Sequence, residues 1–339
     1  MTLPVFFDRR QLLHRPVHEW TKGEKIAHPE TLDRAETIVE TIEADSNFFS
    51  IYQPQEIPLS LIQNVHVPGM LMLYETAQRV IAEGESFYPS VFPKRSASLV
   101  DPTDIRQAGY FCFDSGTPLT FNTWEAARLS ASCAHEAALY VESAKGRVAY
   151  ALCRPPGHHA SHDLFGGYCY VNNAAVIAKR VRKKCRVAIL DIDFHHGNGT
   201  QDIFYRDDAV LVVSVHGNPK EFYPFFSGYE TEKGEGRGKG FNLNIPLPRG
   251  CDGQEYMRQM RLKVLPFIQS FDPGLLIVSA GFDTYQDDPI GAFALETGDY
   301  AELGEIIGKL NISTIILQEG GYHVQKLGLN VTTFLRGFR

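Results

Sequence analysis

The sequence predicts an α/β fold in which a parallel sheet is covered by helices on both faces. Three observations lead to this prediction. From residue 122 onward, short apolar runs alternate with longer segments of helical periodicity. The apolar runs are hydrophobic almost without interruption, which is typical of parallel strands buried on both faces. Polar residues then follow directly after several of these runs, at the edge where open parallel sheets bind their ligands.

The regular part of the pattern begins at residue 122. Strands are expected at 147–153, 186–194, 209–217, 274–282 and 314–322, and 241–248 is a candidate for one more. Helices are expected at 122–144, 172–184, 253–271 and 298–310.

The first 120 residues are less regular. They predict one helix near 29–43 and otherwise long loops. Residues 84–105 are expected to form a loop that covers the mouth of the site or builds a dimer contact. Because no linker, internal repeat or low-complexity tract divides the chain, we expect a single domain over residues 1–339.

Composition narrows the class of protein. The 339 residues are 44% hydrophobic, enough for a large core, and the net charge of −7 argues against a nucleic-acid-binding surface. No apolar run approaches the ~18 residues of a membrane span, and the N-terminus lacks a signal-peptide core. The six cysteines form no CxxC pair, which fits reduced thiols better than a disulfide framework. We therefore expect a soluble cytoplasmic protein.

The segment "DIDFHHGNG" concentrates polar residues where a buried strand ends. Asp191, Asp193 and His195 share one face of an extended chain, and neighbouring carboxylates repel unless a cation compensates them. Asp193 and His195 can bind one metal ion together with Asp283 from "SAGFD", the oxygen and nitrogen ligands of a catalytic zinc site. In the alternative, the aspartates cap a turn and the histidines are ordinary core residues.

Two other strand ends supply groups for catalysis. The motif "RPPGHHA" places His158 and His159 side by side for general acid–base work, and Asp191 and Asn198 are candidates to orient them. The motif "EGGY" carries Tyr322, whose phenol can donate a hydrogen bond to a developing oxyanion. The "GHH" and "EGGY" motifs alone are more often structural, but together with the metal ligands they describe a metal-activated hydrolase.

With these residues assembled, the chain resembles the zinc-dependent histone deacetylases and acetylpolyamine amidohydrolases. The matching motifs occur in the family's order from about residue 28: "HPETLDR", "RPPGHHA", "GGYCYVNNAA", "DIDFHHGNGTQDIFY", "SVHG", "SAGFD" and "EGGY". "FGGYCYVNNAA", "TWEAA" and "GLNV" are most similar to the bacterial acetylpolyamine branch, and Asn198 fits that branch or the class II deacetylases. The resemblance implies the arginase/deacetylase fold, with a central parallel eight-stranded sheet.

The resemblance also implies roles for the catalytic residues. Its zinc ligands, one ion per chain, are Asp193, His195 and Asp283. His159 is the general base and then the general acid, with His158 as its electrostatic partner. Tyr322 polarises the acetyl carbonyl.

Further implied residues surround this centre. Tyr168, Tyr223 and Gly167 line a narrow substrate tunnel. Asp191 and Ser214, with backbone carbonyls, hold a structural K⁺.

One departure from the family concerns the rim of the tunnel. The acetylpolyamine branch has a carboxylate before "TWEAA" that attracts a cationic substrate, and here Gly116 takes that position. Asp114 lies two residues earlier and is the candidate rim residue, with Arg106 nearby. This departure weakens the polyamine assignment and leaves the chemistry untouched.

The expected function is removal of acetyl groups from N-acetylated amines, acetylpolyamines being favoured. Alternatives are a class II type deacetylase of acetyl-lysine proteins, a two-manganese ureohydrolase with Asp191 as a metal ligand, and a non-catalytic binder of acetylated amines. The expected partner is a small-molecule amine, without nucleic acid or membrane, and a homodimer is an open alternative to a monomer. His196 is assigned only support of its loop.

Overall fold

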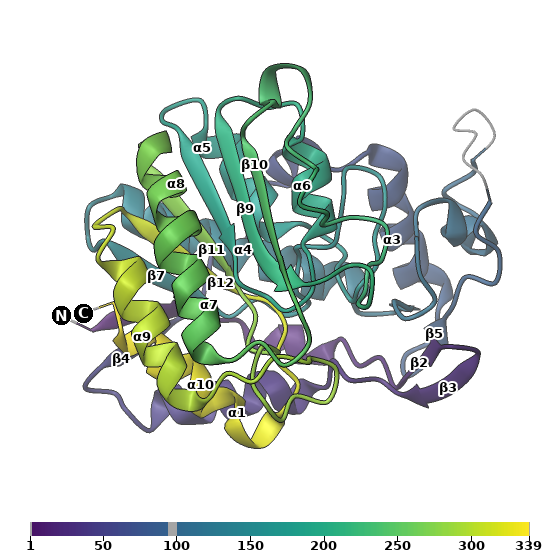
Figure 1. The fold of residues 1–339 in the computed structure, drawn as a ribbon. Coiled ribbons are helices and arrows are strands. Elements are labelled where there is room, and N and C mark those ends of the chain that lie inside the picture. Colours follow the sequence, from purple (N-terminus) through teal and green to yellow (C-terminus); the bar gives the residue numbers. More distant parts are fainter. Residues whose placement is uncertain (1, 94–99, 339) are drawn as a thin grey trace.

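A single eight-stranded sheet organises the computed structural model, which describes residues 2–93 and 100–338 (Figure 1). The strand order is β10-β9-β8-β11-β12-β7-β1-β4, and every neighbouring pair is parallel. The strands are β1 (Leu3–Phe6), β4 (Phe49–Tyr52), β7 (Val148–Ala151), β8 (Val187–Asp191), β9 (Val210–Gly217), β10 (Asn242–Leu247), β11 (Leu275–Ala280) and β12 (Thr314–Gln318). The predicted parallel eight-stranded sheet is confirmed.

The six inner strands contribute side chains to two separate hydrophobic cores, whereas the edge strands β4 and β10 contribute to one core only. In β8, Ala188 and Leu190 pack into one core, whereas Val187 and Ile189 pack into the core on the other face. All five residues of β8 are buried. Burial on both faces is the physical reason why this strand is a continuous apolar run in the sequence.

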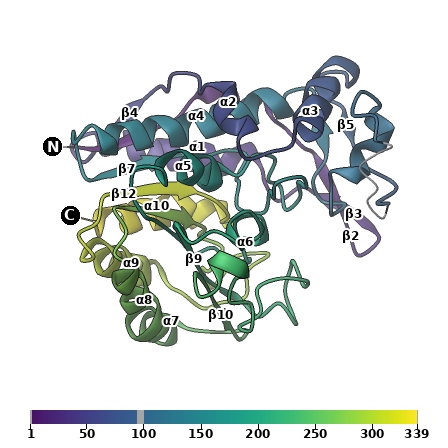
Figure 2. The same ribbon diagram turned by 90° about the horizontal axis from the view of Figure 1, so that it is seen from above.

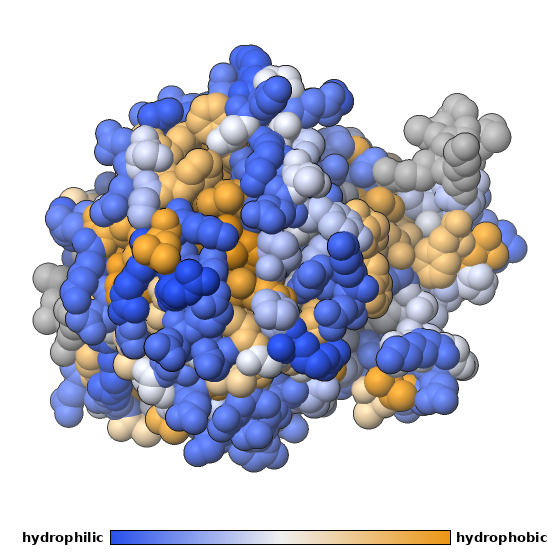
Figure 3. Space-filling view, viewed as in Figure 1, coloured by the Kyte–Doolittle hydropathy of each residue, from blue (hydrophilic) through white to orange (hydrophobic). Residues whose placement is uncertain are grey.

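Helices cover both faces of the sheet. One core includes residues of α1 (Leu32–Glu43), α7 (Gly253–Gln259), α8 (Leu265–Phe271), α9 (Thr297–Gly308) and α10 (Val324–Arg336). The other includes residues of α2 (Leu59–Gln63), α3 (Pro68–Val80), α4 (Thr123–Glu142), α5 (Asn173–Val181) and α6 (Asn198–Phe204). Figure 2 shows α7–α9 and α4–α5 on opposite sides of the strands, and the outward faces of α7–α9 are mainly hydrophilic (Figure 3). Within the described residues, no helix combines the length and apolar character needed to cross a bilayer.

The first 120 residues are more regular than the sequence predicts. Besides α1, they supply two strands of the main sheet, β1 and β4, and the helices α2 and α3. Both strands are only four residues long, "LPVF" and "FSIY", and they lie outside the alternation of strands and helices that marks the equally short β7. The expected helix at 253–271 is also interrupted, by a π-helical turn at Met260–Val264.

Two small antiparallel strand pairs lie outside the main sheet. Strands β2 (His18–Thr21) and β3 (Glu24–Ala27) form one antiparallel pair, which projects beside the main body in Figure 1. Strands β5 (Ser86–Phe87) and β6 (Leu119–Thr120) form the other. Residues 86–87 of the expected 84–105 loop therefore form a strand, β5. Residues 94–99 of that loop lie outside the described residues.

Candidate active site

The carboxyl ends of five adjacent strands, β9, β8, β11, β12 and β7, carry the predicted site residues. A cavity of about 720 Å³ opens there. Its lining includes five residues predicted for the metal, base and oxyanion roles: His158, His159, Asp193, His195 and Tyr322. It also includes the predicted wall residues Asp114, Gly167, Tyr168 and Tyr223. None of the described residues of 84–105 lines it.

Asp193, His195 and Asp283 form one compact group. One ligand atom from each lies within 4.8 Å of the others. Nδ1 of His195 donates to Oδ2 of Asp283 at 2.9 Å and lies 3.5 Å from Oδ1 of Asp193. Backbone N–H groups of Gly320 and Phe194 donate to Asp193 and Asp283 and fix the orientation of both carboxylates.

The electrostatics of this group suit a divalent metal ion. Asp193 and Asp283 are fully buried, and burial together with the charge of Asp193 raises the pKa of Asp283 to about 7. Burial lowers the pKa of His195, but hydrogen bonds to both carboxylates outweigh burial and raise it to about 10. A buried Asp–His–Asp donor set with excess negative charge fits a zinc site with an open position.

The two adjacent histidines sit in different environments. His158 donates from Nδ1 to Oδ2 of Asp191 at 2.9 Å. Burial opposes its charge, but the charges of Asp191 and Asp193 raise the pKa of His158 well above its usual value. His159 instead lies 2.7 Å from Oδ1 of Asn198, and burial and the charge of His158 hold its pKa well below the usual value. The pair therefore combines one charged imidazole with one neutral imidazole. Acid–base chemistry needs two groups whose pKa values are separated in this way.

Tyr322 is held by contacts from two distant segments. Oδ2 of Asp288 accepts from its backbone N–H at 2.6 Å. The guanidinium of Arg34 lies 4.5 Å from the centre of its ring and donates to the carbonyls of Glu319 and Gly321. Burial raises the pKa of Tyr322 well above its usual value, so the phenol stays protonated and can donate a hydrogen bond.

The cavity wall pairs each predicted tunnel tyrosine with a carboxylate. Tyr223 donates to Oδ2 of Asp114 at 2.8 Å, and Gly167 donates its N–H to the same oxygen at 2.6 Å. Tyr168 donates to Oε2 of Glu19 at 2.6 Å. Gly167 has a φ of +56°, and a Cβ there would lie 2.2 Å from the ring of His159, so this position requires glycine.

The predicted rim residues do not share one environment. Asp114 is bound into the wall, whereas Arg106 is largely exposed and pairs with Asp104. Gly116 lies close to Glu19: a Cβ atom on Gly116 would be only 3.1 Å from Oε2 of the Glu19 carboxylate. The carboxylate beside Gly116 therefore comes from the β2–β3 hairpin.

Asp191 and Ser214, the predicted K⁺ ligands, are register neighbours on β8 and β9. Nε2 of His216 donates to the carbonyl of Gly228 at 2.8 Å, so its Nδ1 is free to accept from Ser214 Oγ at 2.7 Å. The ring of His196 packs against that of His216, with centres 4.5 Å apart, and its Nδ1 lies 3.3 Å from the same hydroxyl. His196 thus packs against β9 in a buried polar group, which is compatible with the support role expected of it.

Comparison with known proteins identifies the family. A family model described as "Histone deacetylase domain" matches residues 28–338. This protein belongs to the histone deacetylase family. It is 40% identical to acetylpolyamine amidohydrolase 2 of Pseudomonas aeruginosa, over 99% of this chain and 98% of that protein. It is 39% identical to the acetylpolyamine amidohydrolase of Mycoplana ramosa, over 98% of both chains.

A solved structure extends this family relation to the fold. The crystal structure of the acetylpolyamine aminohydrolase from Burkholderia pseudomallei superposes with a TM-score of 0.93 at 37% identity, covering 99% of this chain and 98% of that one. The predicted arginase/deacetylase fold and the predicted relation to the bacterial acetylpolyamine branch are both confirmed.

Sequence reasoning missed several residues that shape the site. Glu19 lies in the irregular N-terminal part, where no period pointed to it. Arg34, Asp288 and Glu319 each lie inside or beside a motif, but only their contacts reveal what they hold. The one sequence signal for Asp288 is its place in "DDP", shortly after the motif "SAGFD".

Proposed function

We propose that this protein is a zinc-dependent amidohydrolase, a single catalytic domain that removes the acetyl group from N-acetylated polyamines. The observation that carries the proposal is the arrangement at the base of the cavity. A metal-binding triad, a neutral imidazole and a protonated phenol meet there, in a family whose similar members are named acetylpolyamine amidohydrolases.

Zinc would be held by Asp193, His195 and Asp283. When bound, it supplies a Lewis acid and a water of lowered pKa. A structural K⁺ would lie at Asp191 and Ser214, two oxygen-bearing side chains that are register neighbours on β8 and β9.

His159 moves the proton. The side-chain oxygen of Asn198 only accepts hydrogen bonds, so Nδ1 of His159 carries the hydrogen and Nε2 has the free electron pair. Nε2 accepts a proton from the attacking water and returns it to the departing amine as the C–N bond breaks. The products are acetate and the free amine.

His158 and Tyr322 stabilise the charges that develop. His158 is held in its charged state by Asp191 and lies beside His159, with ring centres 4.0 Å apart. Tyr322 donates its phenolic hydrogen to the oxyanion of the tetrahedral intermediate. Its ring stands 6.1 Å from that of Tyr168, at the wall that would hold the acetyl-bearing chain.

Charge on the wall supports a cationic substrate. Glu19 and Asp114 both line the cavity and each accepts from a wall tyrosine. Two carboxylates and aromatic faces suit the aliphatic chain and ammonium groups of a polyamine. An acetyl-lysine peptide is the second candidate substrate, because the same catalytic groups would cleave it.

A side-by-side assay decides the substrate. We expect a higher kcat/KM for acetylputrescine or acetylspermidine than for an acetyl-lysine peptide, and preference for the peptide would overturn the proposal.

Metal analysis is expected to give one zinc per chain. Two manganese ions with turnover of a guanidino substrate would instead support a ureohydrolase, and no turnover of any acetylated amine by the zinc-loaded protein would support a binding protein.

Location and assembly are also proposals. We infer a cytoplasmic protein that acts on a small molecule and requires no nucleic acid or membrane. Light scattering on the purified chain tests whether it forms the homodimer that was considered above.

A further inference from the structure

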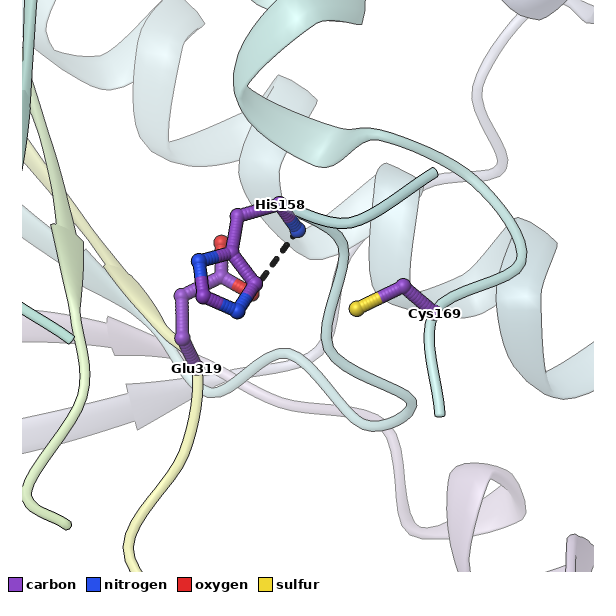
Figure 4. Close-up of side chains that lie close together, drawn as sticks. All are labelled: His158, Cys169 and Glu319. Atoms are coloured by element: carbon purple, nitrogen blue, oxygen red, sulfur yellow. Dashed lines mark hydrogen bonds between the residues drawn. The ribbon is translucent and has the colours of Figure 1, made fainter. Parts of the chain in front are cut away.

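A second group of potential metal ligands lies beside the catalytic histidines. One ligand atom each of His158, Cys169 and Glu319 lies within 4.8 Å of the others, and all three residues are buried (Figure 4). They come from three segments: the loop after β7, the turn at 166–169 and the end of β12. In Figure 4 the sulfur of Cys169 points toward the imidazole of His158 and the carboxylate of Glu319.

Glu319 has one carboxylate oxygen in use and one without a partner. Oε2 accepts from the N–H groups of Gly157 and His158 at 2.7 and 3.2 Å. Oε1 has no hydrogen-bond partner within the described structure, although the residue is only 1% exposed. A buried unpaired carboxylate oxygen is costly, and a bound cation would remove that cost.

The other two side chains also keep a ligand atom available. Nδ1 of His158 donates to Asp191, so Nε2 is the nitrogen that can bind an ion, and its proton must leave when the ion binds. Sγ of Cys169 lies 3.2 Å from the backbone carbonyl of Gly167 and accepts from the backbone N–H of His159, and no side chain of the described residues is hydrogen-bonded to it. Sulfur, imidazole nitrogen and carboxylate oxygen together favour Zn²⁺, Co²⁺ or Cd²⁺ over Mg²⁺ or Ca²⁺.

We propose that His158, Cys169 and Glu319 form a second metal site, whose occupation by a thiophilic divalent ion inhibits the enzyme. The inhibitory part rests on the proposed function. An ion at this site would displace the proton from Nε2 of His158 and remove the charged imidazole that stabilises the developing charge beside His159. Sulfur distinguishes the site from the Asp193–His195–Asp283 group, which has none.

The binding test adds Co²⁺ to protein already loaded with one zinc per chain, in a buffer with a non-thiol reductant. Binding to Cys169 produces a thiolate-to-cobalt charge-transfer band in the near ultraviolet, even if some cobalt exchanges into the sulfur-free site. We expect the band to saturate at one ion per chain and to vanish in Cys169→Ser. Cys251→Ser, a control at another buried thiol, should keep it. No band in the unchanged protein, or a band that survives in Cys169→Ser, overturns the proposal.

The activity test uses the same titration. At saturation kcat should fall by about 10-fold or more, since acid–base catalysis contributes ~10²–10⁴. Cys169→Ser should keep its activity in excess Co²⁺, and Glu319→Gln should weaken the band and the inhibition together. Inhibition that persists in Cys169→Ser places the inhibitory ion elsewhere and overturns the proposal. If no acetylated amine is hydrolysed, the proposed function fails, but the charge-transfer band still decides whether the metal site exists.

Discussion

Nδ1 of His159 donates a hydrogen bond to Oδ1 of Asn198 at 2.7 Å, and this contact determines which ring nitrogen faces the cavity. Because an amide oxygen is neutral, it fixes the tautomer without favouring the charged imidazole as strongly as a carboxylate would. Asn198 therefore helps to keep His159 neutral and able to accept a proton.

Replacing Asn198 by Asp should raise the pKa of His159, because the new carboxylate favours the charged imidazole. His159 must be deprotonated to act as a base, so the acidic limb of the kcat/KM profile should move to higher pH, by about one unit. Profiles recorded over the same pH range for both proteins measure the shift. Coincident profiles would contradict the role given to this contact.

Removing the phenol of Tyr322 should slow catalysis without affecting binding to the same extent. Tyr322→Phe is expected to lower kcat by about 10²–10³, as for other lost oxyanion donors, with a smaller change in KM. Tyr256→Phe is a matched control, because the hydroxyl of Tyr256 is buried without a partner in the described structure. Full activity of Tyr322→Phe would remove this residue from the mechanism.

Glu19 should affect charged substrates selectively. Glu19→Gln keeps an acceptor for Tyr168 but loses the negative charge, so kcat/KM for acetylspermidine should fall by roughly 5- to 10-fold, the effect of ~1 kcal/mol. A neutral acetylated amide of similar length should be unaffected. Glu24→Gln on the same hairpin, which is exposed, is the control, and equal losses for both substrates would argue for a structural role only.

Glu30 is predicted to be important for stability. It binds two buried arginines, Arg34 at 2.8 Å and Arg154 at 2.9 Å. Glu30→Gln leaves their charges uncompensated and should lower the free energy of unfolding by about 3–5 kcal/mol. Urea denaturation measures the loss, and Glu43→Gln, which removes an exposed pair with Arg9, should cost at most ~1 kcal/mol.

His66 should make the fold sensitive to acid. Its Nε2 accepts from the N–H of Asn172, and burial lowers its pKa to about 3. The unfolded chain binds a proton near pH 6.5 but the native protein does not, so stability is present above pH 6.5 and is lost as the pH falls toward 3. The free energy of unfolding of His66→Gln should fall less steeply over this range, and equal slopes would contradict the assignment.

Much of this architecture was readable from the sequence because the information is local. Strands such as β8 and β11 are continuous apolar runs, and their polar ends must meet at one edge of a parallel sheet. The motifs from residue 154 onward accordingly predict the residues of the metal, base and oxyanion roles that line the cavity. Strands β1 and β4 are not predicted because, unlike the equally short β7, they lie outside the regular alternation of strands and helices that begins at residue 122.

What the sequence by itself determined is the set of reacting groups, since their types and their places after buried strands are written in the chain. Tertiary structure alone decided their environments. Only the fold brings Glu19 to the cavity wall beside Tyr168. It also brings Asp288 within hydrogen-bond distance of the Tyr322 backbone, and Cys169 close to Glu319. These partners are separated by many residues and meet through packing. Burial and neighbouring charge then give His158 and His159, adjacent in sequence, opposite shifts in pKa.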